Sequence, residues 1–287
     1  MITRRCVSKR RGAKVSAALT AAALSLALPQ GRALAADWPQ ESLRGSFTTE
    51  APVRWDGINF GGHFGLSTMD TDFGGGTGQQ VAYILRESTL EQEARPSSWA
   101  ALPHNITNSR SYGAFIGYSY QMQDIVLGFD AAYNRMSSAN ADASDTLTRG
   151  VTTSDGVGHI VTIDARSSVK LVDYATMRVR AGYVMGQFLP YAFVGGAVGR
   201  FNYSTRSTVT SAETPPAPAL PYVYGPITAT DAKDNAIVGG VAAGLGMDIA
   251  LLPNLFLRGE WEYVGFARVN GIRTSINTGR VGLGMRF

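Results

Sequence analysis

Cysteine is nearly absent from this sequence. The chain of 287 residues contains one, Cys6, which precedes an apolar segment close to the N-terminus. If that segment is a leader that is removed, as argued below, the mature chain holds no thiol. A disulfide framework, a thiolate metal site and a cysteine nucleophile are then excluded.

Long apolar runs are also scarce. After residue 35, no segment has the ~18 consecutive apolar residues of a transmembrane helix, so any membrane insertion must use strands. Charged residues make up only 17% of the chain, whereas glycine (33 residues) and aromatic residues (10%) are plentiful. That mixture favours strands and turns over packed helices, and it predicts an all-β protein.

The first 35 residues have the pattern of a secretory signal peptide. Six basic residues precede the apolar stretch 15–28, and Ala33 and Ala35 follow with the small-x-small spacing of a cleavage site. A stretch this short does not span a hydrocarbon core of ~30 Å as a helix, which disfavours a membrane anchor. We predict cleavage after Ala35, a periplasmic linker over 36–54 and a folded domain over 55–287.

The basic character of the full chain belongs to this leader. The formal net charge is +4, but residues 1–35 hold seven Lys and Arg and no acidic residue. Removing them leaves 19 basic against 22 acidic residues, a net charge of −3. With that balance nothing points to a nucleic-acid partner.

Eight segments of the predicted domain alternate in polarity with a period of two. In the first, Ile58, Phe60 and Phe64 share one face, while Asn59 and His63 share the other. Glycines blur the facing of the fifth segment, which we leave open. The eight segments span residues 58–67, 112–121, 125–134, 174–185, 191–203, 237–249, 255–265 and 274–287.

Short and long connections between these segments alternate. Tight connections near 122–124, 186–188 and 251–254 force antiparallel neighbours. The stretches 68–110, 137–172 and 204–235 are long, and we expect them to be mobile loops. Short turns on one side and long loops on the other are typical of outer-membrane barrels. The sequence therefore predicts an antiparallel, eight-stranded, up-and-down transmembrane β-barrel with short periplasmic turns and long extracellular loops.

Two barrels of opposite polarity fit the same alternation. A soluble lipocalin-type barrel hides its apolar face, whereas a transmembrane barrel turns that face to lipid. The less aromatic face carries charges on several strands, which would leave little apolar lining for a greasy ligand. Turned inward, these charges can pair and close the lumen, and we favour that arrangement. They are Asp130, Arg178, Arg180, Arg258, Glu260, Glu262, Arg280 and Arg286.

Aromatic residues support the lipid-facing arrangement. Membrane interfaces favour girdles of Tyr and Trp at both ends of the apolar band. The girdle candidates are Tyr112, Tyr118, Tyr120, Tyr133, Tyr183, Tyr191, Trp261 and Tyr263. The last segment ends on Phe287, and a terminal Phe resembles the signal read by the outer-membrane barrel-assembly machinery.

Several motifs resemble the small outer-membrane barrel proteins common in alphaproteobacteria, which are OmpA-type eight-stranded immunogenic or surface proteins. Residues 55–62 (WDGINFGG) are similar to the W-x-G-x-Y-x-G-G opening of that family. Further matching segments are 178–183, 188–191, 195–196, 257–263 and 281–287. The chain departs from the family in its longer first two loops and in Asn59-Phe60. The resemblance implies a surface barrel with a structural role, and in some members porin or haemin-binding activity.

Candidate catalytic and ligand sites are few. The three histidines lack metal-ligand spacing, and we find no nucleophile, base and carboxylate arranged for catalysis, so we expect no metal site and no enzyme. His63 should fill the lumen as a hydrogen-bonded side chain. By analogy with the family, His104 and His159 could ligate haem iron if their loops converge; otherwise no cofactor is expected.

We therefore expect a structural or surface-interaction protein of the outer membrane without catalytic activity. A narrow diffusion porin is the first alternative, and a haemin-binding surface protein is the second. The expected partners are outer-membrane lipid, lipopolysaccharide and, during insertion, the barrel-assembly machinery. The protein is expected to be a monomer.

Overall fold

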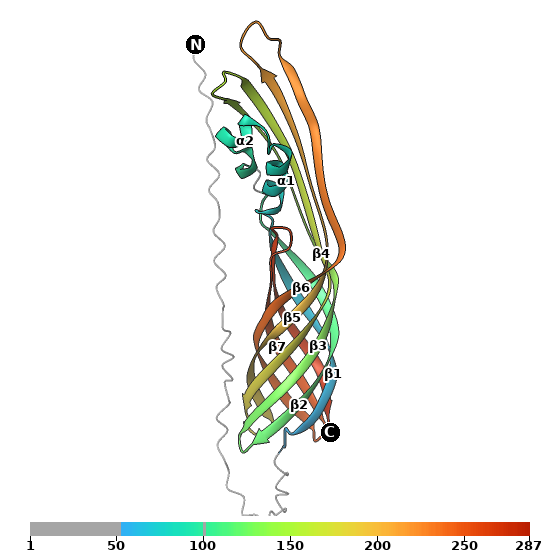
Figure 1. Cartoon of the computed structure of the whole chain (residues 1–287). Coiled ribbons are helices and arrows are strands. Elements are labelled where there is room, and N and C mark those ends of the chain that lie inside the picture. Colours follow the sequence, from blue (N-terminus) through green and yellow to red (C-terminus); the bar gives the residue numbers. More distant parts are fainter. Residues whose placement is uncertain (1–52, 100–101) are drawn as a thin grey trace, which may run out of the picture. The chain divides into compact units, whose positions relative to one another are not determined.

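Strands make up most of the fold (Figure 1). The computed structural model describes residues 53–99 and 102–287. The predicted leader, 1–35, and nearly all of the predicted linker, 36–54, lie outside these residues. The elements are β1 (Gly57–Asp72), α1 (Gly76–Ile84), α2 (Thr89–Ala94), η1 (Pro96–Ser98), β2 (Asn105–Met122), β3 (Ile125–Thr152), β4 (Gly158–Tyr183), β5 (Phe188–Thr214), β6 (Tyr222–Leu252), β7 (Leu255–Phe266) and β8 (Arg273–Arg286).

The eight strands close into one antiparallel barrel. Each strand pairs with the next along the chain, and β1 also pairs with β8, which completes the ring. The predicted up-and-down topology is confirmed. The faces predicted for the first segment are confirmed as well, because Ile58 and Phe64 are exposed while Asn59 and His63 are buried.

Tight turns lie at one end of the barrel, which we call the turn end. They join β2 to β3, β4 to β5 and β6 to β7, as the short connections predicted. Gln123 takes a positive φ of 54° in the first of these turns. The two ends of the barrel sequence also meet here, since the Ile58 amide donates to the Phe287 carbonyl at 3.0 Å and the Phe287 amide donates back at 2.9 Å.

At the opposite end, four strands continue well beyond the ring (Figure 1). Residues 137–152, 158–172, 202–214 and 222–236 of β3 to β6 stay paired and form what we call the projecting sheet. The prediction that 137–172 and 204–235 are loops is therefore wrong. Only 153–157 and 215–221 are connections, and the second holds the proline-rich stretch.

The prediction of a loop over 68–110 is wrong as well, because 68–72 belong to β1, 105–110 belong to β2, and the connection between them carries α1, α2 and η1. Ser88 caps α2 by accepting a hydrogen bond from the Glu91 amide. Val81 and Leu90 of this segment pack against the projecting sheet, where Val161 and Val209 belong to the same buried cluster. In the part of the chain that the structure describes, no helix combines the length and the apolar character needed to cross a membrane.

The outer surface changes character between the barrel and the projecting sheet. Along β4, the outward side chains of Met177 and Val179 are exposed and apolar, whereas Asp164, Arg166 and Lys170 further along are polar or charged. An apolar belt of this extent on the barrel suits contact with lipid. Its members include Ile58, Phe60, Phe64, Leu66, Ile116, Leu127, Phe129, Met177, Val179, Val194, Val241, Leu245, Val281, Leu283 and Met285.

Most of the predicted girdle residues lie on this outer surface, but Tyr191 does not. Tyr191 is 5% exposed and points into the lumen, so its assignment to the girdle is wrong. Glycine on the neighbouring strand makes the room: a Cβ at Gly246 would lie 2.5 Å from the Tyr191 ring, and one at Gly244 would lie 2.5 Å from the ring of Phe193.

Candidate functional site

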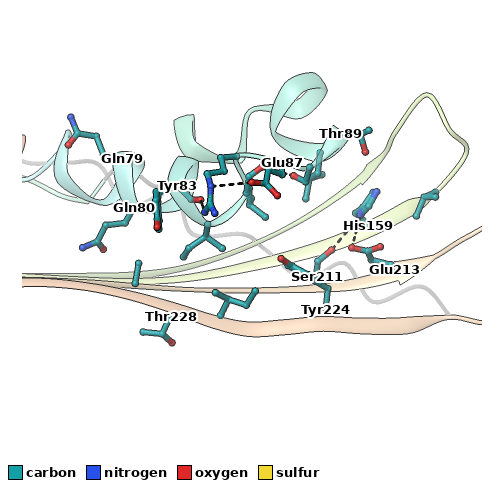
Figure 2. Close-up of a pocket in the computed structure, with 18 of the residues that line it drawn as sticks. Gln79, Gln80, Tyr83, Glu87, Thr89, His159, Ser211, Glu213, Tyr224 and Thr228 are labelled. Atoms are coloured by element: carbon teal, nitrogen blue, oxygen red, sulfur yellow. Dashed lines mark hydrogen bonds and ion pairs between the residues drawn. The ribbon is translucent and has the colours of Figure 1, made fainter.

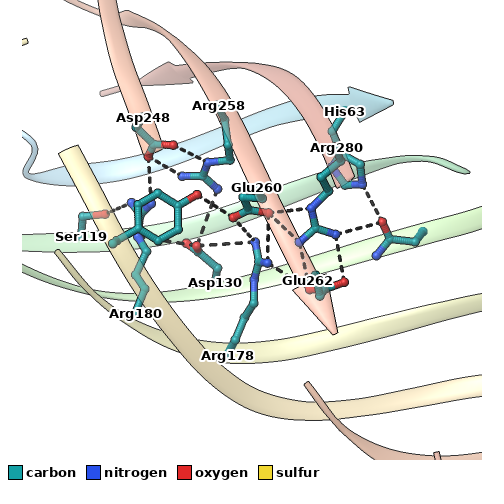
Figure 3. Close-up of polar contacts among 12 residues, drawn as sticks. His63, Ser119, Asp130, Arg178, Arg180, Asp248, Arg258, Glu260, Glu262 and Arg280 are labelled. Carbon is teal, nitrogen blue, oxygen red and sulfur yellow. Dashed lines mark hydrogen bonds and ion pairs between the residues drawn. The ribbon is translucent and has the colours of Figure 1, made fainter. Parts of the chain in front are cut away.

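Charged side chains fill the middle of the barrel (Figure 3). Four guanidinium groups and four carboxylates, all buried, form a group that we call the lumen charge network. The two signs are equal in number, and each of these charges lies within 4.0 Å of a group of opposite sign, as buried ions require. The network consists of Arg178, Arg180, Arg258 and Arg280 with Asp130, Asp248, Glu260 and Glu262.

One half of the network joins β4 to β7 and β8 across the lumen. Arg178 donates to both carboxylate oxygens of Glu260, at 3.1 and 3.0 Å, and to Glu262 at 3.1 Å. Arg280 donates to Glu260 at 2.6 Å and to Glu262 at 3.1 and 2.9 Å. Tyr191 adds a hydroxyl donor to Glu260 at 2.6 Å. Both carboxylates therefore accept from two guanidinium groups.

The other half centres on Asp248. Arg258 donates to its two oxygens at 2.8 Å each, and Arg180 donates to one of them at 2.9 Å. Asp130 lies 3.6 to 3.8 Å from Arg178, Arg180 and Arg258 and completes the charge balance. A glycine leaves space for Asp130, since a Cβ at Gly117 would lie 1.9 Å from its Oδ1.

The structure brings together seven of the eight charged residues that the sequence pointed inward. Arg286 stands apart, which corrects its assignment to the network. Its guanidinium lies over the Trp55 ring at 4.6 Å and donates to the Pro253 carbonyl at 2.8 Å. The physical reason is position: Arg286 ends β8 beside the turns, and the ion pairs lie further along the lumen.

Asp248 is the network member that sequence reasoning missed. The signal was present, because Gly244, Gly246 and Asp248 alternate with the exposed Leu245 and Met247 in the sixth segment. Because the inner face carries glycine before Asp248, the alternation of polar and apolar residues in this segment was hard to recognise.

Two apolar clusters accompany the charge network in the lumen. One includes Trp55, Leu189 and Phe256, from the strand ends beside the turns. The other includes Tyr174 and Phe266, near the level where the ring passes into the projecting sheet. His63 contacts Asn134 at 2.6 Å between ring nitrogen and amide oxygen, in the hydrogen-bonded position expected for it. Charged and aromatic side chains together fill the interior.

The two histidines considered as haem ligands do not converge. His104 pairs with Asp70 at 2.5 Å beside the start of β2. The side chain of the next residue, Asn105, bonds the carbonyl of Asp142, which pairs with Ser168 of β4. His159 lies nine residues further along β4, about 30 Å away at ~3.3 Å per residue. One iron cannot take both imidazoles at that separation.

His159 instead belongs to a network at the tips of the projecting sheet. Its Nε2 lies 3.0 Å from Thr153 Oγ1, and its Nδ1 lies 3.6 Å from Glu213. Thr153 donates to Asp155 at 2.5 Å, and this bond, with the Val157 amide, lowers the pKa of Asp155. The network ties one hairpin tip to the neighbouring strand.

A cleft opens between the helices and the projecting sheet (Figure 2). Its volume is about 980 Å³. We call it the tyrosine cleft, because Tyr83 lines it from α1 and Tyr222 and Tyr224 line it from β6. The hydroxyl of Tyr222 donates to Glu213 at 2.5 Å, and this bond raises the pKa of Tyr222. Among the described residues, no group of three or more His, Cys, Asp or Glu could hold a metal ion.

Comparison with known proteins identifies the family of the chain. The family model described as "Outer membrane protein beta-barrel domain" matches residues 18–287. The chain belongs to the outer membrane protein β-barrel family. This family member is located in the outer membrane of the cell, as predicted. No match is found among curated proteins.

Three solved structures are similar to this chain at low identity. Ail of Yersinia pestis is 12% identical, with 81% of this chain and 99% of Ail covered and a TM-score of 0.30. Neisserial surface protein A is 10% identical (81% and 100% covered, TM-score 0.32), and OprG of Pseudomonas aeruginosa is 12% identical (81% and 97% covered, TM-score 0.34). Similarities at these values carry no argument about function.

Proposed function

We propose that this outer-membrane barrel is a structural and surface-interaction protein without catalytic activity. In this proposal the turn end faces the periplasm and the projecting sheet stands outside the cell. The polar outer face of the projecting sheet supports that orientation, because it is suited to water, whereas the belt below it is suited to lipid. We also propose that the protein is one of the alphaproteobacterial surface barrels that its motifs resemble.

The observation that carries the proposal is the filled lumen. A barrel of about eight strands has an interior just wide enough for side chains, and here the network and two apolar clusters occupy it. The guanidinium groups are held by multiple bonds: Arg178 and Arg280 each bind two carboxylates. A solute would have to break buried ion pairs to pass, which favours a closed barrel over a porin.

Reconstitution into planar lipid bilayers tests this function. We expect the purified barrel to give no steady, resolvable single-channel steps. The double variant Arg178→Ala with Glu260→Ala removes two large lumen side chains and serves as the positive control. We expect single-channel steps from this variant. Steady steps from the unaltered protein would overturn the closed-barrel proposal in favour of a diffusion porin.

The partners of the barrel belong to the same proposal. We propose that the monomer contacts lipid and lipopolysaccharide through its apolar belt, and that Phe287 is read by the barrel-assembly machinery. The exposed Phe287 ring stacks on Phe60 with centroids 5.7 Å apart, on the outer surface. An outward terminal aromatic ring is accessible to an insertion partner before the barrel closes.

A further inference from the structure

The tyrosine cleft is a feature of the molecule that closure of the barrel does not require. One wall is helical and presents Gln79, Gln80 and Tyr83, and the other is formed by β4 to β6 and presents Ser211 and Tyr224 (Figure 2). Its volume of about 980 Å³ is at the upper end of the ~300–1,000 Å³ usual for ligand pockets. It is therefore large enough for a ligand of several linked rings.

Charge argues against an anionic ligand. Four carboxylates line the cleft, and the one guanidinium among its lining residues is Arg86. That guanidinium is already engaged: it lies over the Tyr83 ring at 4.4 Å, donates to the Tyr83 carbonyl at 2.8 Å and lies 3.6 Å from Glu87. A phosphate or sulfate group would meet net negative charge here.

The carboxylates do not make a cation site either, because most of them have partners. Glu213 accepts from Tyr222 and lies beside His159. Asp155 accepts from the Thr153 hydroxyl at 2.5 Å and from the Val157 amide at 3.1 Å. These bonds leave the acidic groups little capacity to replace the hydration shell of an added cation.

The cleft is also a poor site for a lipid or a haem. Fifteen of its 23 lining residues carry hydroxyl, amide or carboxylate groups. Among the apolar ones, Leu85 and Leu90 are turned into the buried cluster beneath, whereas Ile227 is partly exposed. A greasy ligand would bury these polar groups without partners, which costs free energy.

Amide and aromatic groups remain available. Gln80 donates to the Thr205 carbonyl at 3.0 Å, but its buried Oε1 has no hydrogen-bond partner in the described part of the chain. Tyr83 and Tyr224 are 65% and 40% exposed. A Tyr ring offers an apolar face with a polar tip, and an amide offers both donors and an acceptor. Rings with apolar C–H faces and hydroxyl edges complement that combination.

We propose that the tyrosine cleft binds a neutral oligosaccharide, with ring faces packed against Tyr83 and Tyr224 and hydroxyl groups bonded by Gln79 and Gln80. The inference deepens the proposed surface role and rests on it. It names the chemical class of ligand that the projecting part of the molecule takes.

A peptide added to the free edge of β6 is the main competing occupant. Between Tyr222 and Gly239, one edge of β6 pairs with β5, and no described strand pairs with its other edge. That edge contains Pro226, which has no amide hydrogen, and the charged Asp231 and Lys233. Prolines and charges are the features that protect sheet edges from adding a strand. The edge therefore disfavours a peptide, while the cleft beside it stays open.

The test is calorimetric titration of the full barrel in lauryldimethylamine oxide, a detergent without a sugar headgroup. The neutral probes are cellotetraose, maltotetraose and tetra-N-acetylchitotetraose. Sucrose octasulfate, spermine and an extended Thr-Val repeat peptide represent the anionic, cationic and peptide alternatives. We expect saturable binding of at least one neutral probe with a Kd below about 1 mM.

Three variants locate the site. Tyr224→Ala and Tyr83→Ala, on opposite walls, should each weaken binding about five- to tenfold, as loss of one aromatic contact does. Val223→Ala is the matched control, because Val223 precedes Tyr224 in β6, is 64% exposed and does not line the cleft. Its Kd should stay within about twofold of the unaltered protein. Heat-dependent gel mobility shows whether each variant is folded.

Three outcomes would overturn the proposal: no neutral probe binds below about 1 mM, a charged probe or the peptide binds more tightly, or the control weakens binding as much as the cleft variants. Conductance reports on the lumen and calorimetry on the cleft. A conducting barrel would therefore contradict the proposed function alone, and an empty cleft would contradict this inference alone.

Discussion

At the scale of single residues, this barrel buries ions where a soluble protein of similar size would bury mostly apolar side chains. Glu262 is fully buried and accepts from Arg178, Arg280 and Tyr174. Its charge is tolerable only while the guanidinium groups face it, because removing one partner leaves the others uncompensated. The stability of the barrel should therefore respond to single changes of charge in the lumen.

Glu262→Gln tests that expectation. The variant keeps the size of the side chain and removes the charge that two arginines require, so we expect a loss of ~3–5 kcal/mol in the free energy of unfolding. Urea unfolding in lipid vesicles, followed by tryptophan fluorescence and gel mobility, gives the value.

Asp164→Asn is the matched control for this change. Asp164 pairs with Arg166 at 3.3 Å on the exposed face of the projecting sheet, where ion pairs contribute less than ~1 kcal/mol. Equal losses in the two variants would show that the lumen pairs are not stabilising in the way the contacts indicate.

The sequence identified seven of the eight charges of the lumen network as facing inward, but not which of them meet. Alternation with period two assigns a side chain to a face, and it assigned Arg178, Glu260 and Glu262 correctly to the inner one. Partners depend on strand register and on depth along the lumen, which the alternation within one strand does not reveal. Arg286 shares the inner face of β8 with Arg280, yet it lies beside the turns and bonds a carbonyl instead of a carboxylate.

At the scale of elements, the strands of the ring were predictable and their extensions were not. Within the ring, large apolar residues such as Phe129 and Val179 alternate with charged or small ones, so the period is plain. In the β3 part of the projecting sheet the outer face carries Asn, Asp, Ser and Thr and the inner face carries small residues such as Ala141, so the contrast in polarity is weak. In the β4 part the contrast is present, because the buried Ile163 and Leu171 alternate with polar residues, and sequence reasoning missed this period of two.

The closing strand offers a test at this scale. Phe287 completes the pairing of β8 with β1 through two backbone hydrogen bonds with Ile58, and its ring stacks on Phe60. A chain truncated at Arg286 loses these contacts and the terminal aromatic ring, so we expect a severalfold lower yield of inserted barrel. Quantitative blotting of outer-membrane fractions measures it.

Phe60→Leu serves as the control for the truncation, because it removes the stacking partner and keeps the terminal ring. If the two variants gave the same yield, lost packing would explain the defect and Phe287 would not be an assembly signal.

At the scale of the whole molecule, the ring and the projecting sheet share four continuous strands, although the outer surface of the ring suits lipid and that of the projecting sheet suits water. The ring presents an apolar belt and a lumen closed by ion pairs, whereas the projecting sheet presents a polar outer face and a cleft beneath its helices. Charge pairing and ring closure involve barrel residues, while the tyrosine cleft is lined by the projecting sheet, by the segment that carries the helices and, at one place, by Asn270 of the connection between β7 and β8. The two parts should therefore be separable by truncation along the strand register.

Shortening both hairpins tests that separation. Ser144 pairs with Arg166, and Arg206 pairs with Thr230, so replacing 145–165 and 207–229 by Asn-Gly turns keeps the register of the strands that remain. We expect the shortened chain to insert, to show heat-dependent mobility and to stay closed in planar bilayers, because its lumen charge network is unchanged. It should lose oligosaccharide binding, because His159, Ser211 and Tyr224 are absent. A shortened chain that fails to insert, while Val223→Ala inserts normally, would show instead that the projecting sheet is needed to form the ring.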